Sequence, residues 1–377
     1  MYREPITAAP DQPRGPDQSF GIALAQLFMR NLGVLPFVPR PSRGSRRAVK
    51  MVPATLVTDG RNMRYSVSDN VNAHGPEGPD SPPIWAVNIH GYFAGGTMYW
   101  RESANLAEKL GWRVINPTLP GFAGSDPLPW QRVTIGEITD QVVNLLDNLG
   151  VERAVLLGHS MGGAIAVRIA ASQPNRVLGV IYRDGAATPE WKHRHGILTT
   201  VLSPFMPETA TLIDLTLSVV MDSPDLLIGR RLSSTMRGLW PDAQLNMRAL
   251  GKVLPVGSML MSLDMTDEVR QLPDRQIPVL AEWGCFDRVV TARCAQEFCD
   301  LAKCSTVWVP GGHSWMLPRP QGQSDILKHL PAGQDFIAKV IERRSVLKED
   351  AERVSTDSAE LATVAPIDMF RRSGNAG

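Results

Sequence analysis

The stretch AVLLGHSMGGAIAVRIAAS, residues 154–172, decides the fold. Its apolar run Ala154–Leu157 predicts a buried strand, and the Ala- and Ile-rich run Met161–Ser172 predicts a helix. Between them stands a G-x-S-x-G pattern centred on Ser160. The chemistry of such a turn needs glycines, because the chain bends so sharply that a Cβ two positions to either side would clash. The pattern therefore predicts a strained strand-to-helix turn that lifts the serine hydroxyl above a sheet.

On both sides of this turn, short apolar runs alternate with helical stretches. Such alternation is typical of βαβ units and a largely parallel sheet. We expect strands at residues 54–57, 64–67, 85–89, 113–116, 154–157, 178–182, 278–283 and 306–309, with helices at 97–110, 135–149, 161–172 and 291–301. The first two strands flank an Asp59-Gly60 turn and should pair antiparallel. The predicted fold class is α/β, with a doubly wound, mostly parallel sheet of about eight strands.

The same pattern divides the chain into segments. Alternation stops over residues 188–270, where helical patches are broken by prolines, and this segment is predicted to be a helical cap or lid. Residues 54–187 and 271–342 form the predicted core. Residues 1–53 are expected to be an N-terminal extension with an amphipathic helix, and residues 343–377 a C-terminal tail.

The extension carries an apolar segment, residues 19–38, whose polar positions fall on one narrow helical face. It is too interrupted to predict a membrane span. Two interpretations stay open: a helix packed on the protein body or on a partner, or an interfacial anchor. Five basic residues that follow would assist an anchor: Arg40, Arg43, Arg46, Arg47 and Lys50. No signal peptide is recognised at the start, so a cytoplasmic location is predicted, with peripheral membrane contact as the alternative.

Composition argues against several functional classes. Lys plus Arg number 39 and Asp plus Glu 38, so the charge balance predicts no nucleic-acid partner and favours a weakly charged small molecule. The four cysteines lack the close pairs of a zinc site and the spread of a disulfide framework, and are expected to be reduced thiols: Cys285, Cys294, Cys299 and Cys304. No phosphate loop, dinucleotide motif or HExxH is present, so neither cofactor nor metal is predicted. The oligomeric state is left open.

A serine hydroxyl is a weak nucleophile at neutral pH, so it needs a base and a group that orients the base. His313 and Asp287 each follow a predicted strand and should lie at the carboxyl edge of the sheet. We therefore predict Ser160 as nucleophile, His313 as base and Asp287 as orienting carboxylate. The amide of Met161, at the start of a helix, should point at an oxyanion formed beside the serine.

With these residues in place, the segment from 54 to about 342 resembles an α/β-hydrolase with a cap domain. The order Ser, Asp, His along the chain is the order expected of that superfamily. His90-Gly-Tyr92 is similar to the family's oxyanion turn, which implies that the Tyr92 amide is the second oxyanion donor. The three-glycine version of that motif is missing, which argues against esterases of the hormone-sensitive-lipase type.

Alternatives exist for the acid and the base. Asp184 follows the strand after the serine turn, where some relatives of this fold carry their acid, so it is the alternative to Asp287. His90 and His159 flank the predicted site and are expected to be structural. The remaining histidines are expected at the surface: His74, His193, His195 and His329.

The resemblance implies a serine hydrolase that cleaves a carboxylic ester of a mainly apolar small molecule through an acyl-enzyme. The methionine-rich cap is explained equally well by an acyl-binding cleft and by ordinary packing. The same residue set serves thioesterases, lactonases, C–C hydrolases, acyltransferases and cofactor-free haloperoxidases, and a non-catalytic receptor is a further alternative. A serine at this position argues against dehalogenases and epoxide hydrolases, which attack with aspartate.

Overall fold

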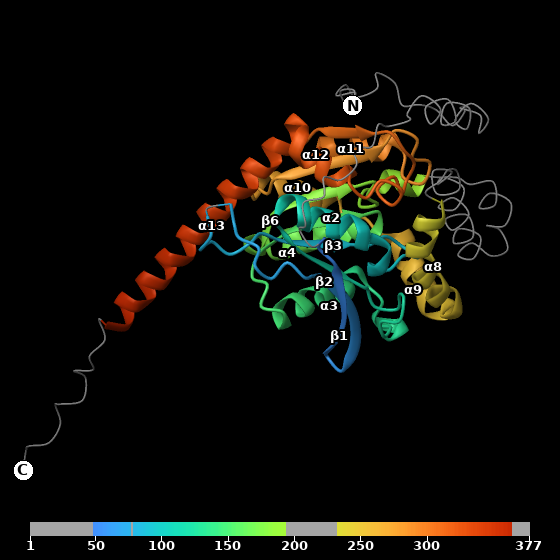
Figure 1. Ribbon diagram of the computed structural model, residues 1–377, viewed down its shortest axis with the longest axis horizontal. Coiled ribbons are helices and arrows are strands. Elements are labelled where there is room, and N and C mark those ends of the chain that lie inside the picture. Colours follow the sequence, from blue (N-terminus) through green and yellow to red (C-terminus); the bar gives the residue numbers. More distant parts are fainter. Residues whose placement is uncertain (1–47, 77, 194–231, 364–377) are drawn as a thin grey trace, which may run out of the picture.

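The computed structural model describes residues 48–76, 78–193 and 232–363 of the 377-residue chain (Figure 1). The helix predicted at residues 19–38 lies outside these ranges, as does part of the predicted cap, residues 194–231. Among the helices in the described ranges, none combines the length and the apolar character that crossing a membrane requires.

The centre of the molecule is an eight-stranded sheet in the order β1-β2-β4-β3-β5-β6-β7-β8. Its strands are β1 (Met51–Thr58), β2 (Arg61–Ser68), β3 (Trp85–Ile89), β4 (Arg113–Pro117), β5 (Ala154–His159), β6 (Val177–Arg183), β7 (Val279–Gly284) and β8 (Thr306–Val309). Strand β2 pairs antiparallel with both β1 and β4, and every other neighbouring pair is parallel. This arrangement confirms the predicted α/β class and the mostly parallel sheet.

Helices cover both faces of the sheet because the central strands are apolar on both faces. In β5, Ala154 and Leu156 belong to one hydrophobic core, whereas Val155 and Leu157 belong to the other. The first core is covered by α3 (Ile135–Asn148), α4 (Met161–Ser172) and α11 (Ala292–Ala302). The second is covered by α2 (Trp100–Leu110), α12 (Gly322–His329) and α13 (Pro331–Thr363). The sheet is thus doubly wound, as predicted.

Some element boundaries differ from those expected. The β1–β2 hairpin is longer, because the ladder from the Asp59-Gly60 turn continues until Met51 pairs with Ser68. Pro53 is accommodated because β1 is an edge strand, where a missing N–H costs no ladder hydrogen bond. At the other end of the chain, α13 runs without a break through residue 342, where the core was expected to end, and extends away from the body (Figure 1).

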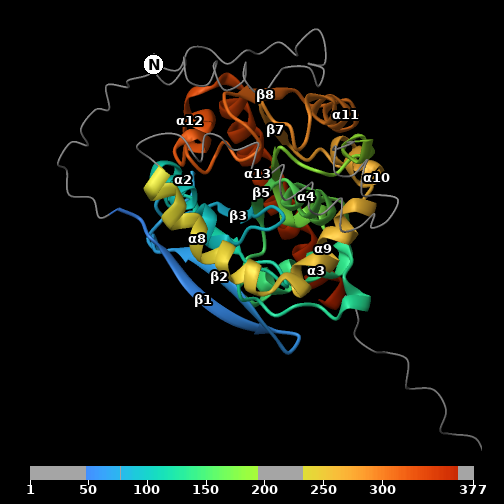
Figure 2. The same ribbon diagram turned by 90° about the vertical axis from the view of Figure 1, so that its right-hand side faces the viewer.

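The segment predicted as a cap, which is called the cap below, contains the described helices α8 (Leu232–Arg248) and α9 (Leu250–Ser262), and α10 (Thr266–Asp274) crosses its predicted limit at residue 270. Figure 1 shows α8 and α9 at the opposite end of the body from the free end of α13, and Figure 2 shows them in front of the central strands. Helix α9 buries Val253, Val256 and Leu260 in the same core as Tyr92, which follows β3. The cap therefore lies at the carboxyl edge of the sheet, where the predicted site residues emerge.

Candidate active site

Ser160 occupies the strained turn that the sequence predicts. Its backbone has φ 53° and ψ −119°, between the end of β5 and the start of α4. A Cβ at Gly158 would come within 2.4 Å of the Gly162 carbonyl oxygen, and a Cβ at Gly162 within 2.2 Å of the Ile89 carbonyl oxygen. Both glycines are required because backbone atoms, which cannot move aside, fill the space a side chain would need.

The core holds this turn through backbone hydrogen bonds. The Ser160 amide donates to the Arg183 carbonyl at 3.0 Å, which ties the turn to the end of β6. The Ser160 carbonyl accepts from the amides of Gly163 at 2.9 Å and Ala186 at 3.2 Å. A non-glycine residue at positive φ persists only where its surroundings fix it, and these three bonds do so.

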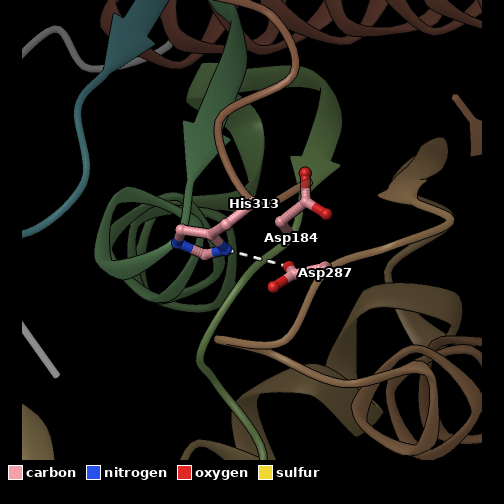
Figure 3. Close-up of side chains that lie close together, drawn as sticks. All are labelled: Asp184, Asp287 and His313. Carbon is pink, nitrogen blue, oxygen red and sulfur yellow. Dashed lines mark hydrogen bonds and ion pairs between the residues drawn. The ribbon is translucent and has the colours of Figure 1, made fainter. Parts of the chain in front are cut away.

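His313 and Asp287, which come from the loops after β8 and β7, meet in a hydrogen bond (Figure 3). His313 Nδ1 lies 2.9 Å from Asp287 Oδ2, and both side chains are buried. An ionised carboxylate only accepts, so Nδ1 carries the proton and Nε2 is the ring nitrogen whose lone pair can act as a base. The other carboxylate oxygen of Asp287 accepts from the amides of Val289 at 2.7 Å and Val290 at 2.9 Å, which fixes its orientation.

Asp184, the alternative acid, makes different bonds. Its two oxygens accept from the Gly284 amide at 2.7 Å and from Trp315 Nε1 at 2.8 Å. These partners belong to the two loops that carry Asp287 and His313, so Asp184 links the loops together. Burial, and then the nearby charge of Asp287, raise the pKa of Asp184 well above its usual range. The orienting bond to the His313 ring comes from Asp287.

His159, directly before the serine, is a fixed neutral group. Its Nε2 lies 2.9 Å from the His313 carbonyl, which only accepts, so Nε2 carries the proton. Its Nδ1 then accepts from the Tyr99 hydroxyl at 2.7 Å. Burial, reinforced by His313 and Arg183, holds the pKa of His159 well below its usual range. With both ring nitrogens occupied, His159 positions the His313 backbone and has no free atom with which to act as a base.

His90 is likewise structural. Its Nδ1 donates to the Gly91 carbonyl at 2.8 Å, and its Nε2 accepts from the Leu119 amide at 2.9 Å. Burial lowers the pKa of His90 to about 4, so the ring is neutral at physiological pH. Both flanking histidines therefore have the structural character expected from the sequence.

The turn after β3 lies directly against the serine. A Cβ at Gly91 would be 3.1 Å from the Ser160 Cβ and 3.0 Å from His159 Nδ1. Within the part of the chain that the structure describes, the amides of Tyr92 and Met161 donate no hydrogen bond to another protein group. Two unpaired N–H groups on adjacent turns can stabilise an oxyanion.

One group of three described residues lies close enough together to bind a metal ion. One ligand atom each from Asp184, Asp287 and His313 lie within 4.8 Å of one another. The carboxylate oxygens and His313 Nδ1 are, however, committed to the bonds described above, which suit proton transfer better than metal ligation.

Sequence reasoning missed two buried polar residues of the cap. Asp242 and Asn246 lie one helical turn apart on α8, and both hydrogen-bond to the loop after β3. They belong to no sequence motif. The sequence shows only that two polar residues are spaced i, i+4 in a helical patch, and it does not show that both are buried.

Comparison with known proteins agrees with the fold and the serine turn. The family model described as alpha/beta hydrolase fold matches residues 86–227. A protein provisionally named a non-heme haloperoxidase, from Mycobacterium phage D29, is 27% identical over 246 residues, which cover 64% of this chain and 85% of that protein. A pimeloyl-acyl-carrier-protein methyl ester esterase of Shewanella woodyi is 27% identical over 216 residues, covering 55% of this chain and 77% of its own.

A solved structure shows the same architecture. The enol-lactonase from Burkholderia xenovorans LB400 superposes with a TM-score of 0.56 at 18% identity, over 76% of this chain and 100% of its own. Sequence matches, sheet order and the strained serine turn together show that the chain has the α/β-hydrolase fold.

Proposed function

We propose that the protein is a carboxylic ester hydrolase that works through an acyl-enzyme. Ser160 is the nucleophile, His313 its base and Asp287 the carboxylate that orients the base. The amides of Tyr92 and Met161 are the two oxyanion donors. The substrate is a mainly apolar small molecule, and the reaction uses no cofactor.

In the first half-reaction the Ser160 oxygen attacks the ester carbonyl carbon while His313 Nε2 takes the hydroxyl proton. The carbonyl oxygen becomes an oxyanion, which the two amides stabilise by hydrogen bonds that are strongest in the transition state. The tetrahedral species collapses as the C–O bond to the alcohol breaks and His313 returns the proton to the departing oxygen. Asp287 stabilises the imidazolium that exists between these two proton transfers.

In the second half-reaction a water molecule replaces the alcohol. His313 Nε2 takes a proton from the water, whose oxygen attacks the acyl carbon of the serine ester. Collapse of the second tetrahedral species breaks the bond to the Ser160 oxygen, which receives the proton back from His313. The products are the free acid and the original enzyme.

The single observation that carries this proposal is the 2.9 Å bond between His313 Nδ1 and Asp287 Oδ2. It fixes the tautomer that a base needs, and the hydrogen bond from His159 Nε2 to the His313 carbonyl holds the same loop beside the residue that precedes Ser160. The rings of His159 and His313 lie 4.8 Å apart between centroids.

Several relatives support an acyl oxygen ester as the substrate class. Their names include a methyl ester esterase, a lipase, an enol-lactonase and an enzyme that degrades N-acyl homoserine lactones. Other names are a haloperoxidase and a hydrolase of 2-hydroxy-6-oxo-6-phenylhexa-2,4-dienoate, so the same fold also serves other chemistry.

The residues of the cap give only partial support to the proposal of an apolar substrate. Val253, Val256 and Leu260 present an apolar face of α9 to the core that contains Tyr92. Met265 is 1% exposed and packs as an ordinary core residue. Val253 and Leu260 are equally buried, at 0% and 2% exposed, so the apolar preference is a prediction for the acyl-length panel to test.

The test is a panel of p-nitrophenyl esters of increasing acyl length, with thioesters and lactones in parallel and Ser160→Ala as the blank. We expect a pre-steady-state burst of p-nitrophenol, because acylation releases the alcohol before water frees the acid. Turnover should rise with acyl length over the short members. Equal rates for wild type and Ser160→Ala would refute the assigned nucleophile, and a flat response to chain length would refute the apolar substrate.

A further inference from the structure

The turn that carries the Tyr92 amide is strained. The Ala94 amide donates to the Gly91 carbonyl at 3.3 Å, which closes a four-residue turn with Tyr92 and Phe93 at its centre. Phe93, the third residue, has φ 60°. Turns of this kind favour glycine or asparagine at that position, because a bulky side chain at positive φ is disfavoured. Something outside the turn must therefore hold it.

Asn246, from the cap helix α8, makes that contact. Its Nδ2 donates to the Phe93 carbonyl at 2.9 Å and to the Ala94 carbonyl at 3.1 Å. Its side chain is fully buried, so water does not compete for these bonds. Both carbonyls belong to the strained half of the turn, immediately after the residue whose amide faces the oxyanion.

The same side chain also holds a second strained residue. Asn246 Oδ1 accepts from the Ala123 amide at 2.7 Å, and Ala123 has φ 39°. Ala123 lies in the loop after β4, which also contacts β2 through a bond from Arg64 to the Ala123 carbonyl. One carboxamide thus joins the oxyanion turn to a loop of the core, and each of its donors and its acceptor is used.

Asp242, one turn earlier on α8, reinforces the contact further along the loop. It accepts from the Met98 amide at 3.2 Å. A Cβ on Gly95 would lie 2.6 Å from Asp242 Oδ2, so α8 approaches the loop as closely as a glycine allows. The cap and the oxyanion turn are therefore packed as one unit.

From these contacts we infer that Asn246 is a positioning residue of the oxyanion hole: the cap, through this side chain, fixes the turn that aims the Tyr92 amide. The inference rests on the proposed acyl-enzyme chemistry. It assigns to the cap a part in transition-state stabilisation as well as in covering the substrate. Asparagine suits the role because two carbonyls require two N–H donors, which an aspartate lacks.

The first test compares Asn246→Asp and Asn246→Ala with the matched control Arg248→Ala, an exposed residue on the same helix. Asn246→Asp keeps the shape and the acceptor but turns two attractive contacts into repulsive ones. Loss of a complete oxyanion donor costs about 10²–10³-fold in kcat, so displacement of one donor should cost roughly 10–100-fold. KM should stay within about twofold, because the donor acts in the transition state. The control should match wild type.

The second test does not depend on catalysis. Hydrogen exchange of peptides covering residues 91–98 should speed up in both Asn246 variants and stay unchanged in Arg248→Ala, at a temperature where all three are folded. Unchanged exchange in the Asn246 variants would overturn the inference whether or not the wild type hydrolyses esters. Faster exchange with unchanged kcat would overturn it too, since the turn would then be loosened without consequence. Failure of the proposed function appears separately, as absence of a Ser160-dependent burst in the wild type.

Discussion

Two strained turns carry the proposed oxyanion donors, and they are held from different parts of the molecule. Ser160, at φ 53°, is fixed by backbone bonds to Arg183, Gly163 and Ala186, all within the core. Phe93, at φ 60°, is fixed by a side chain of the cap, Asn246. The first turn is part of the sheet's own ladder and helix start, whereas the second depends on a segment inserted between β6 and β7.

The core and the cap therefore fix different parts of the proposed site. The proposed nucleophile, base and acid lie on core elements that cannot shift without disrupting the sheet, so changes in the cap should not alter their relative positions. The Tyr92 amide should respond to changes in the cap. Variants of the core should therefore give large losses of turnover, and variants of the cap should give smaller losses confined to kcat.

The largest effect is expected at the acid. Asp287→Asn removes the acceptor that fixes the His313 tautomer, and kcat should fall by roughly 10³–10⁴-fold. Asp184→Asn loses one of two acceptors, for the Gly284 amide or for Trp315, and should cost no more than about tenfold. Steady-state kinetics on both variants checks this, and a reversed order of the two losses would make Asp184 the functional acid.

A somewhat smaller loss of kcat is expected from a substitution at Gly162, where core backbone atoms pack against the serine turn. Gly162→Ala places a Cβ against the Ile89 carbonyl, so the start of α4 must shift and carry the Met161 amide with it. We expect kcat to fall by about 10²–10³-fold and the free energy of unfolding to fall by about 1–3 kcal/mol. Denaturant unfolding and kinetics together measure this.

The matched glycine control is Gly136→Ala in α3, where the nearest atom to a Cβ is Thr134 Oγ1 at 3.8 Å. Its stability should be unchanged or higher by up to about 1 kcal/mol, since alanine favours helix. Equal behaviour of the two variants would mean that the serine turn tolerates a side chain.

Buried charged side chains beneath the serine turn should make the free energy of unfolding depend on pH. Arg183, whose carbonyl holds Ser160, donates to Glu102 at 2.6 Å and to Asn88 at 2.6 Å, with Glu282 nearby. Burial, opposed by Arg183, raises the pKa of Glu282 from 4.5 to about 8. Between these pH values the folded protein keeps a proton that the unfolded chain releases. The free energy of unfolding should therefore decrease as pH rises through this window, by up to about 1.4 kcal/mol per pH unit.

Glu282→Gln removes this titration. Relative to wild type, its free energy of unfolding should increase between pH 4.5 and 8 and level off above that range. Urea unfolding at a series of pH values provides the measurement, and parallel curves for the two proteins would contradict the raised pKa.

The smallest effect is expected at the outer cap contact. Asp242→Asn keeps one acceptor for the Met98 amide, at a point six residues beyond Tyr92. Turnover should stay within about threefold of wild type while the free energy of unfolding falls by about 1 kcal/mol. A loss as large as that of Asn246→Asp would show that the loop as a whole, rather than Phe93, transmits the effect of the cap.

Much of the core could be predicted from sequence because its signals are local. Strand 85–89 and helix 161–172 have the expected limits, since apolar runs bounded by turn residues mark buried elements. The hairpin limits at Met51 and Ser68 were not predicted, because pairing between two partly exposed strands is set by register rather than by hydrophobic pattern.

The candidate site divides in the same way. Ser160, Asp287 and His313 stand beside glycines or strand ends that mark them in the sequence. Asp287 was predicted as the acid with Asp184 as its alternative, because both follow strands and only the fold shows which one the His313 ring meets. Asn246 was not predicted, since its value lies in contacts with residues 153, 152 and 123 positions away. No local pattern encodes contacts of that range.

The most direct measurement of the central claim is the intact mass of the protein after treatment with a fluorophosphonate, followed by peptide mapping. If Ser160 is a nucleophile activated by His313, the protein gains one adduct, mapped to Ser160. Ser160→Ala should gain none, and His313→Ala should react at least about 10²-fold more slowly. An unlabelled wild type, an adduct on another residue, or equal labelling rates for wild type and His313→Ala would contradict the account.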